Sequence, residues 1–330
     1  MTETKRKWRW GVNRWWILGF TLLTVVAVNL IAPVRPHIQV APENVLHEPL
    51  FTLPVIGEFY LTNTLIMLLV VDLIILVIAL IIRNTTRKGS LVPSGLAGAM
   101  ETLLEVIYNL TESSAGKHAR KIFPWFATIS LLVLVGNMSK LLPGVESIGF
   151  IEKTSKEGHE AIELIPGILS TITTGEAHGE GYMLVPFFRG IPTDLNFTVA
   201  LALISVFMTQ VIGVQSQGFR YFSKFFNTLT LFKKPFFGFM DLIVSILELI
   251  SEFAKILSFA FRLFGNMFAG AVLLFLVSSM VPIFFPSLIY MFEFFIGLIQ
   301  AFVFGMLTMV FMAQATRGHG GEEHHEESHA

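Results

Sequence analysis

Long runs of apolar residues recur along the chain and predict membrane-spanning helices. A helix needs about 20 apolar residues to cross the roughly 30 Å of hydrocarbon in a bilayer. Several stretches approach or exceed that length and carry few charges. The predicted crossings are residues 15–31, 61–82, 123–142, 197–214, 236–280 and 283–315.

The last two apolar stretches are longer than one perpendicular crossing requires. At about 1.5 Å per residue, such helices exceed the bilayer thickness, so they must tilt strongly, bend or lie partly along the membrane. Only Val281 and Pro282 separate residues 236–280 from residues 283–315. The pattern therefore predicts an antiparallel hairpin of two strongly tilted helices.

Residues 92–111 show a different pattern. Apolar residues recur there at three- and four-residue spacing, at Leu96, Met100, Leu103, Leu104, Ile107 and Leu110. Glu101, Glu105 and Asn109 occupy another face of the same predicted helix. This spacing predicts an amphipathic surface helix rather than a crossing.

The composition excludes most soluble classes of protein. Of the 330 residues, 53% are hydrophobic and 14% are charged, whereas soluble domains carry about 25% charged residues. So few charges cannot cover a water-facing surface, which excludes a soluble enzyme, a disordered chain and a nucleic-acid binder. The chain has no cysteine, which excludes disulfides and thiolate metal sites. We expect a single all-α, polytopic membrane domain over residues 1–330.

Lysine and arginine are distributed unevenly between alternate connecting segments, which predicts the orientation in the membrane. If the N-terminus is inside, 16 of the 23 Lys and Arg residues fall in cytoplasmic segments and five in outside segments. Cytoplasmic segments of membrane proteins carry the excess of positive charge. We therefore expect both termini in the cytoplasm, a long outside loop at residues 143–192 and a polar cytoplasmic tail at residues 316–330.

The first apolar stretch has two interpretations. A basic start followed by an apolar run is also the pattern of a secretory signal peptide. No small-x-small cleavage site follows residues 15–31 in the sequence, so we favour a retained helix.

Polar and ionisable residues interrupt the penultimate predicted helix. They are Glu248, Ser251, Glu252, Lys255, Ser258, Arg262 and Asn266. At about 100° per residue, most of them fall on one stripe, which must face a partner protein or water rather than lipid. Arg262 is the most informative, because its guanidinium group stays charged at any physiological pH. The alternative is an arginine that snorkels from a helix end, but Arg262 lies far from both ends of residues 236–280.

The hairpin predicts which residues of the two long helices face each other, because residues equally far from the turn lie opposite. Gln300 is predicted to face Arg262 and to hydrogen-bond beside it. Glu293 is predicted to face residues 269–271, about 12 Å toward the outside from Arg262. Glu248 lies about 21 Å from Arg262 toward the cytoplasm. Alternatively, Glu293 is a structural carboxylate that is paired within the hairpin.

Several short motifs resemble one membrane-protein family. Residues 261–267, Phe-Arg-Leu-Phe-Gly-Asn-Met, resemble the Arg-Leu-Phe-Gly-Asn motif of the F-type ATP synthase subunit a family. Residues 300–304, Gln-Ala-Phe-Val-Phe, are similar to the Gln-Ala-hydrophobic run on that family's last helix. Residues 136–143 and 192–196 are similar to the end of one of its earlier spans and to the start of the next. The resemblance runs from about residue 51 to residue 317.

The resemblance implies an ion-translocating subunit that is not catalytic on its own. Arg262 would be the essential arginine that faces the carboxylates of the rotating c-ring, with Gln300 and Asn266 as polar neighbours. Glu248 and Ser251 would line a cytoplasmic half-channel. The implied partners are the c-ring, the peripheral-stalk subunit b and membrane lipid, and the implied location is the bacterial inner membrane. The ion is expected to be H⁺, although the sequence also allows Na⁺.

Three residues depart from the pattern of the family. Ala271 stands where many bacterial members have Glu, and Glu293 stands where they have His. The outside carboxylate is therefore expected on the opposite helix of the hairpin, with Glu293 serving the outside half-channel. Lys140 stands at a position that is acidic in the family, and the sequence assigns no ion-pathway role to it.

Two other functions have some support in the sequence. Residues 325–329 match the H-E-x-x-H pattern of zinc proteases, but they follow a glycine-rich segment and lack the helix, third ligand and cleft of a zinc site. We therefore expect no metal, cofactor or catalytic residue. A secondary transporter with its substrate site around Arg262 would show inverted repeats or helices broken by Gly and Pro, and neither is visible.

Overall fold

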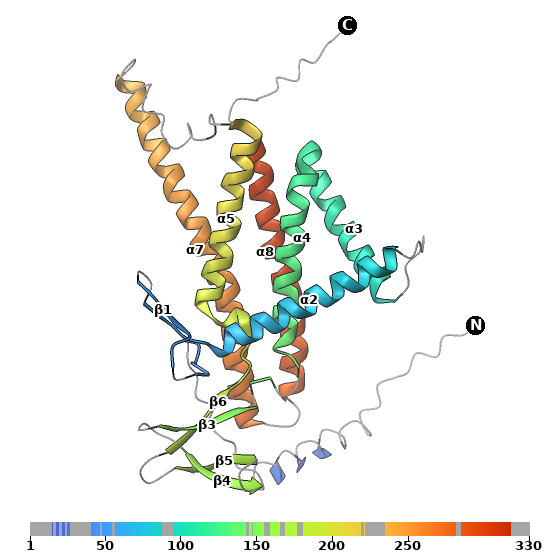
Figure 1. Ribbon diagram of the computed structural model, residues 1–330, viewed down its shortest axis with the longest axis vertical. Helices are drawn as coiled ribbons and strands as arrows, with labels where there is room; N and C mark the ends of the chain where they lie inside the picture. The colour runs from blue at the N-terminus through green and yellow to red at the C-terminus, as the bar shows by residue number, and fades with distance from the viewer. Residues whose placement is uncertain are drawn as a thin grey trace, which may run out of the picture. The chain divides into compact units, whose positions relative to one another are not determined.

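The computed structural model describes most of the chain between residues 41 and 317 (Figure 1). The described residues are 41–46, 48–54, 57–87, 95–142, 145–146, 148–154, 159–165, 169–176, 181–218, 221, 235–281 and 285–317, with seven helical positions between residues 15 and 26. Most of the predicted crossing at residues 15–31, and the tail from residue 318, lie outside the described residues.

The helices match the apolar pattern from residue 61 onward. They are α2 (Asn63–Arg87), α3 (Leu96–Ala115), α4 (Ala119–Ser139), α5 (Leu195–Gln217), α7 (Pro235–Met280) and α8 (Phe285–Thr316), with the short 3₁₀ helices η1 (Gly116–His118) and η2 (Ile191–Thr193). α7 has 46 residues and α8 has 32. At 1.5 Å per residue α7 is about 69 Å long, more than twice the hydrocarbon thickness. The two long C-terminal helices are therefore confirmed.

Five stretches of the described residues are long and apolar enough to cross a membrane. They are Asn63–Thr85, Ala97–Ser139, Leu195–Gln217, Leu242–Met280 and Phe285–Thr316. The second of these combines α3 and α4. Within α3, Glu101 and Glu105 are exposed and Ile107 is buried, which confirms the amphipathic pattern. The chain is a multi-pass membrane protein.

The predicted crossing at residues 123–142 is displaced toward the N-terminus. α4 begins at Ala119 because Arg120 and Lys121 are good helix formers and continue the helix beyond its apolar part. It ends at Ser139, so Lys140 lies directly after the helix instead of inside it.

The expectation of an all-α fold is wrong for the connecting segments. β1 (Phe51–Leu53) pairs with β2 (Gly57–Phe59) in an antiparallel hairpin. Residues 143–192, predicted as a loop, contain β3 (Gly149–Thr154), β4 (His159–Ile165), β5 (Leu169–Glu176) and β6 (Gly181–Pro186). These strands form an antiparallel sheet in the order β3-β6-β4-β5. β5 contains the run Thr171-Ile172-Thr173-Thr174, and such β-branched residues favour strands.

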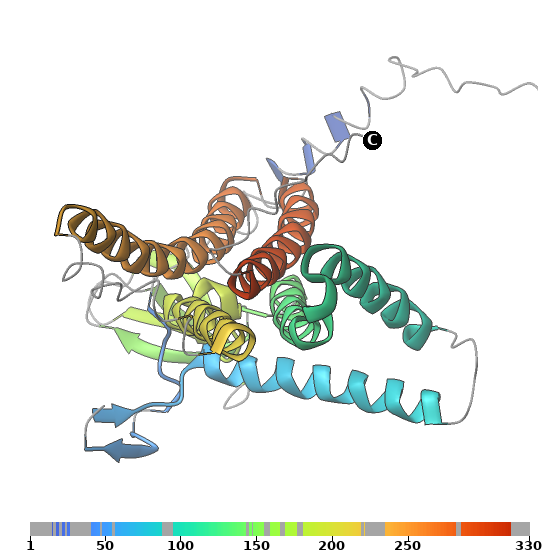
Figure 2. The ribbon, with the colours of Figure 1, turned by 90° about the horizontal axis from the view of Figure 1, so that it is seen from above.

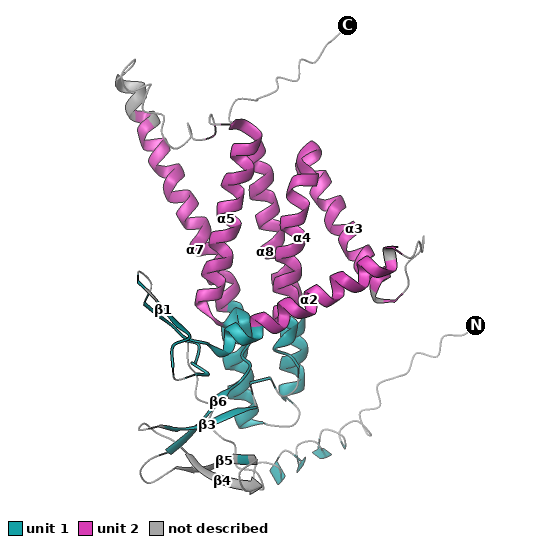
Figure 3. Ribbon diagram, viewed as in Figure 1, with its two compact units in different colours: residues 1–67, 138–193, 266–296 teal, residues 68–137, 194–265, 297–330 magenta. Residues whose placement is uncertain are grey.

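The chain divides into two compact units, each built from three separate segments (Figure 3). Unit 1 comprises residues 1–67, 138–193 and 266–296. Unit 2 comprises residues 68–137, 194–265 and 297–330. α7 and α8 contribute residues to both units, and the single membrane domain expected from the sequence stays a prediction.

In unit 1, hydrogen bonds hold the start of α2 against the segments around it. Asn63 is fully buried, and its backbone N–H donates to the carbonyl of Glu43 at 3.0 Å. Its side-chain amide donates to the carbonyl of Pro186, the last residue of β6, at 3.4 Å. The Arg189 guanidinium group donates to the carbonyl of Ala41 at 2.8 Å. The residues before α2 are thereby joined to the four-stranded sheet.

In unit 2, the core lies where four helices meet. α4, α5 and α8 lie side by side in both views (Figures 1 and 2), and α3 packs against α4. The largest buried members of this core are Ile107, Ile122, Phe126, Ile212, Met309 and Met312. Asn137 of α4 is fully buried and donates to the carbonyl of Gly297 in α8 at 2.7 Å.

Candidate functional site

The register between α7 and α8 agrees with the predicted antiparallel hairpin in each unit. In unit 1, a Cβ atom added to Gly270 would lie 2.6 Å from Oε1 of Glu293. In unit 2, the ring centroids of Phe259 and Phe304 lie 5.0 Å apart. The two residues of each pair are equally far from the turn that follows Met280. The prediction that Glu293 faces residues 269–271 is therefore confirmed.

Glu293 forms a buried ion pair in unit 1. Its Oε1 lies 3.3 Å from Nζ of Lys140, and the two side chains are 3% and 4% exposed. The Lys140 ammonium group also donates to the carbonyl of Met267 in α7 at 3.3 Å. Lys140 follows α4 directly, so this charged group connects the end of α4 to both long helices.

Gly270 makes the room that the Glu293 carboxylate occupies. Any larger residue at position 270 would place its Cβ within 2.6 Å of the carboxylate oxygen, which is well inside van der Waals contact. The neighbouring Ala271, where the resemblance noted in the sequence leads one to expect an acid, is 9% exposed. The carboxylate of this part of the hairpin thus comes from α8 and lies against a gap in α7.

Arg262 lies on an exposed face of α7 in unit 2. Its Nη2 donates to Oγ of Ser258, one helical turn earlier, at 3.1 Å. Leu257 and Phe261 beside it are 56% and 54% exposed. Gln300 is half-buried in the same unit. The predicted hydrogen bond between Arg262 and Gln300 is wrong for the described residues, because the guanidinium group instead reaches along its own helix to Ser258.

The other predicted site residues lie on or near the surface of their units. In unit 2, Ser251 is exposed and Glu248 is half-buried. In unit 1, Asn266 is exposed. Exposure of polar residues on a helix that is otherwise apolar agrees with a stripe that faces water or a partner.

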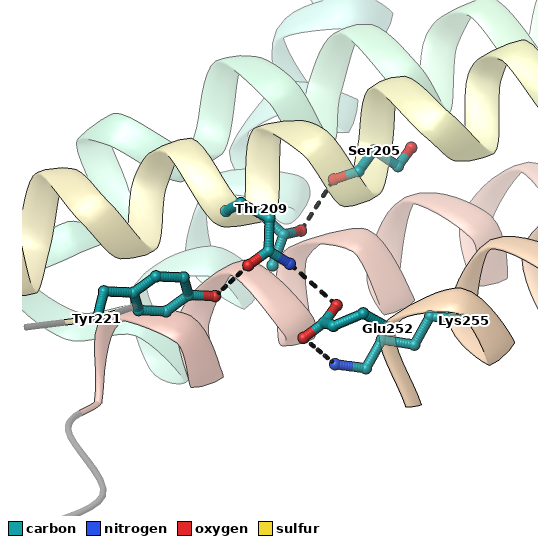
Figure 4. Close-up of polar contacts among 6 residues, drawn as sticks. Ser205, Thr209, Tyr221, Glu252 and Lys255 are labelled. Atoms are coloured by element: carbon teal, nitrogen blue, oxygen red, sulfur yellow. Dashed lines mark hydrogen bonds and ion pairs between the residues drawn. The ribbon is translucent and has the colours of Figure 1, made fainter. Parts of the chain in front are cut away.

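A second charged cluster lies in unit 2, around Glu252 (Figure 4). Nζ of Lys255 lies 3.0 Å from Oε1 of Glu252, and it also lies 4.9 Å from the centroid of the Phe311 ring. Gln210 of α5 donates its amide to Oε2 of Glu252 at 2.9 Å. The hydroxyl of Tyr221 donates to Oε1 of Gln210 at 2.7 Å.

Sequence reasoning missed Lys140, Gln210 and Tyr221 as members of these clusters. A signal existed for two of them: Lys140 is an ionisable residue at the end of a predicted crossing, and Gln210 is an amide inside one. Tyr221 carried no such signal, because it lies outside every predicted helix, in the segment that follows α5. No group of three or more potential metal ligands occurs among the residues that the structure describes.

Comparison with known proteins agrees with the motifs around Arg262. A family model described as ATP synthase A chain matches residues 64–313, which include Lys140, Arg262 and Glu293. The chain belongs to the ATP synthase A chain family. It is therefore a proton-translocating subunit of the membrane sector of an ATP synthase, and it is not catalytic itself.

Three curated relatives each match about 70% of this chain. ATP synthase subunit a of Helicobacter pylori (strain Shi470) is 30% identical over 239 residues, covering 72% of this chain and 83% of the relative. ATP synthase subunit a of Moorella thermoacetica is 28% identical over 235 residues, covering 71% and 83%. ATP synthase subunit a 1 of Syntrophotalea carbinolica is 29% identical over 229 residues, covering 69% and 76%.

Proposed function

We propose that the chain passes protons to and from a rotating c-ring at Arg262, through two aqueous half-channels that are offset from each other. The observation that carries this proposal is a permanent cation on an exposed, apolar helix face. Its described hydrogen bond goes to the neutral hydroxyl of Ser258. A guanidinium group cannot lose its charge, and a charge that faces lipid costs several kcal/mol. A partner that carries carboxylates, such as a c-ring, would supply a counter-charge to Arg262.

The role of Arg262 follows from its charge. A c-ring carboxylate takes a proton from one half-channel, travels through lipid in its neutral form and releases the proton into the other half-channel. Arg262 favours the ionised carboxylate as it passes, because a nearby opposite charge stabilises the charged form. It also repels cations that would otherwise leak directly between the half-channels. The membrane potential supplies about 2.3 kcal/mol per charge per 100 mV, and this energy drives rotation.

The remaining candidate residues divide between the two paths. Glu293 serves the outside half-channel, since it is a carboxylate inside a membrane helix, held against the gap at Gly270. Glu248 and Ser251 line the cytoplasmic half-channel, and both reach the surface of unit 2. Gln300 and Asn266 supply polar side chains near the arginine. The c-ring, the peripheral-stalk subunit b and lipid are the partners of this arrangement.

The orientation follows from the distribution of positive charge. Both termini are proposed to lie in the cytoplasm of a bacterium, with the protein in the inner membrane and the sheet of residues 143–192 outside. This orientation places the Lys140 end of α4 on the outside, next to the sheet that follows it.

Substitution of Arg262 tests the proposed function. Arg262→Ala should abolish proton-driven ATP synthesis while the complex still assembles, and it should allow a passive proton leak. Arg262→Lys should fail as well, because lysine loses the planar donor group and can give up its proton when buried. ATP synthesis and passive proton uptake would be measured in membrane vesicles, with the amount of assembled complex as reference.

A matched control is Arg317→Ala, which removes another guanidinium group from unit 2. Arg317 donates to the carbonyl of Ser114 at 2.9 Å and lies directly after α8. We expect that variant to synthesise ATP at nearly the parent rate. Normal ATP synthesis in Arg262→Ala vesicles would overturn the proposed function.

A further inference from the structure

Lys140 is a buried cation that has no role in the proposed proton path through Arg262 and Glu293. Its side chain is 4% exposed, although lysine is almost never fully buried unless it is paired. The pairing partner is Glu293, at 3.3 Å, which the proposed function places in the outside half-channel. The inference below therefore rests on that function and concerns the same half-channel.

The Lys140 ammonium group lies close to the Glu293 carboxylate and is held in place by a second contact. Nζ donates a hydrogen bond to the carbonyl of Met267 at 3.3 Å and lies 3.3 Å from Oε1 of Glu293 as an ion pair. The Met267 carbonyl belongs to α7 and the carboxylate to α8, so the ammonium group is held between the two helices. Gly270 leaves the space in which Oε1 lies.

A second carboxylate lies at the other end of the Lys140 side chain. Oε1 of Glu146 accepts a hydrogen bond from the backbone N–H of Gly190 at 3.0 Å. A Cβ added to Gly190 would lie 3.3 Å from this oxygen, 3.1 Å from Cβ of Lys140 and 3.4 Å from Cδ of Lys140. The stem of Lys140 and the Glu146 carboxylate thus meet at Gly190. Glu146 is half-exposed, whereas Lys140 and Glu293 are buried.

The backbone holds Glu146 in an unusual conformation. Its φ is +69°, in the left-handed region that residues other than glycine rarely adopt. The N–H of Glu146 donates to the carbonyl of Phe188 at 3.1 Å, and this bond fixes the turn. Such strain persists only where the surroundings hold the residue in place, and it is most frequent at functional sites.

Stability alone is a weak reason for the Lys140–Glu293 pair. Replacing a buried ion pair with apolar residues of similar volume is often neutral or stabilising, since both charges lose their hydration. Removal of one partner is what costs stability, because it leaves the other charge buried and unpaired. The role of Lys140 is therefore better explained by its effect on the charge and position of the Glu293 carboxylate.

We propose that Lys140 is a positioning residue of the outside half-channel, whose ammonium group holds the Glu293 carboxylate ionised and in place, with Glu146 at the solvent-facing end of the same charged cluster. A proton that arrives from outside binds Oε1 of Glu293, and the ion pair opens as the carboxylate becomes neutral. When the proton moves on, the O–H bond breaks and the pair closes again. Lys140 keeps its own protons throughout.

The charged groups around Glu293 define what a pH experiment reports. Lys140 and Glu146 both interact electrostatically with Glu293. Tyr290, one turn earlier on α8, interacts with both glutamates. Substitutions at Lys140 and Glu146 therefore change the two described charged groups on other segments that interact with Glu293, while Tyr290 is left unchanged in every variant.

Lys140→Met tests the proposal, because methionine has a similar length and no charge. In vesicles, ATP-driven proton pumping and proton-driven ATP synthesis should fall about tenfold, with normal assembly. Without the cation, Glu293 should keep its proton more readily, so the pH dependence on the outer side should move about 1 to 3 units upward. Lys140→Arg should restore the parent pH dependence because it restores the charge. Glu146→Gln should move it by less and in the opposite direction, because it removes a negative charge that favours protonated Glu293 and because Glu146 is partly hydrated.

The matched control is Lys153→Met, which removes an exposed lysine from β3 of the same unit. Its rate and pH dependence should equal those of the parent. If Lys140→Met fails to assemble, Lys140→His replaces it, because histidine loses its charge near pH 6.5. Transport by that variant should fall as the outer pH rises through this value, and a flat response would overturn the proposal.

Two further results would show that the pair is only structural. One is Lys140→Met with the parent rate and pH dependence at normal assembly. The other is full transport by the exchanged pair, Lys140→Glu with Glu293→Lys, since the proposal requires the carboxylate at position 293. Failure here is distinguishable from failure of the proposed function: if Arg262→Ala abolishes synthesis while Lys140→Met is normal, only the role of Lys140 is lost.

Discussion

Lys140–Glu293 and Lys255–Glu252, two close pairs of lysine and glutamate in the described part of the chain, are built in different ways. In unit 1, Lys140 follows α4 and Glu293 lies in α8, and the two side chains are 4% and 3% exposed. In unit 2, Glu252 and Lys255 lie three residues apart on α7, and their side chains are 9% and 22% exposed. One pair joins distant parts of the sequence, and the other is a local contact along a helix.

The neighbours of the two pairs differ as well. Glu252 accepts a hydrogen bond from Gln210, and Lys255 lies over the ring of Phe311, so each charge has a second stabilising contact. Lys140 has the carbonyl of Met267, while Glu293 lies against the space at Gly270. The comparison shows two ways to stabilise a lysine–glutamate pair. The local pair on α7 has further contacts to Gln210 and Phe311, whereas in the Lys140–Glu293 pair each charge is stabilised mainly by the other.

The largest effect should separate the two carboxylates. Glu293→Gln should lower proton uptake through the outside path by about 100-fold, the contribution typical of a positioned proton-transfer group. Glu252→Gln should lower it by less than about threefold, because glutamine keeps an acceptor for Gln210. Proton-driven ATP synthesis in vesicles measures both.

A rescue experiment sharpens this prediction. Ala271→Glu combined with Glu293→Gln should recover part of the activity, because Glu293 lies against residues 269–271 on the facing helix. The absence of rescue, together with nearly normal activity of Glu293→Gln alone, would make Glu293 a structural carboxylate like Glu252.

An intermediate effect should come from the glycine beside each cluster. A Cβ added to Gly213 would lie 2.4 Å from the rigid ring of Tyr221, whereas one at Gly270 would meet the movable carboxylate of Glu293 at 2.6 Å. Gly213→Ala should therefore destabilise the subunit by about 1–3 kcal/mol. Gly270→Ala should mainly slow transport, because the carboxylate can move aside. Thermal inactivation of the solubilised complex, compared with ATP synthesis, distinguishes the two, and equal stability losses would contradict this difference.

The smallest effect is expected for Lys255→Met. The lysine is partly exposed, and its contacts with Glu252 and Phe311 are each worth about 0.3–1 kcal/mol. Thermal inactivation should shift slightly, and the pH dependence of ATP synthesis should not change. A pH shift as large as that expected for Lys140→Met would show that the two pairs have equivalent roles.

The helices and the hairpin register could be predicted because both follow from local periodicity. α7 and α8 begin and end within two residues of the predicted bounds. The contact between Gly270 and Glu293 follows from counting equally from the turn. The sheet of residues 149–186 was missed because its strands lie in a segment that has neither the long apolar runs nor the helical spacing from which the helices were predicted. The hydrogen bond of Arg262 was assigned to Gln300 because equal distance from the turn does not decide which of two polar groups a long side chain reaches.

The sequence by itself determined the membrane class of the protein, its long apolar helices and the single arginine at the centre of the penultimate helix. These depend on composition and on residues close together in the chain, where the geometry of a helix leaves little freedom. Only the tertiary structure decided the partners of the buried charges. Lys140, Met267 and Glu293 come from three separate segments and contact one another through the Lys140 ammonium group. Glu252 is hydrogen-bonded to Gln210 of α5. Such contacts depend on how helices pack, and packing is set by the sum of many weak contacts that no local pattern records.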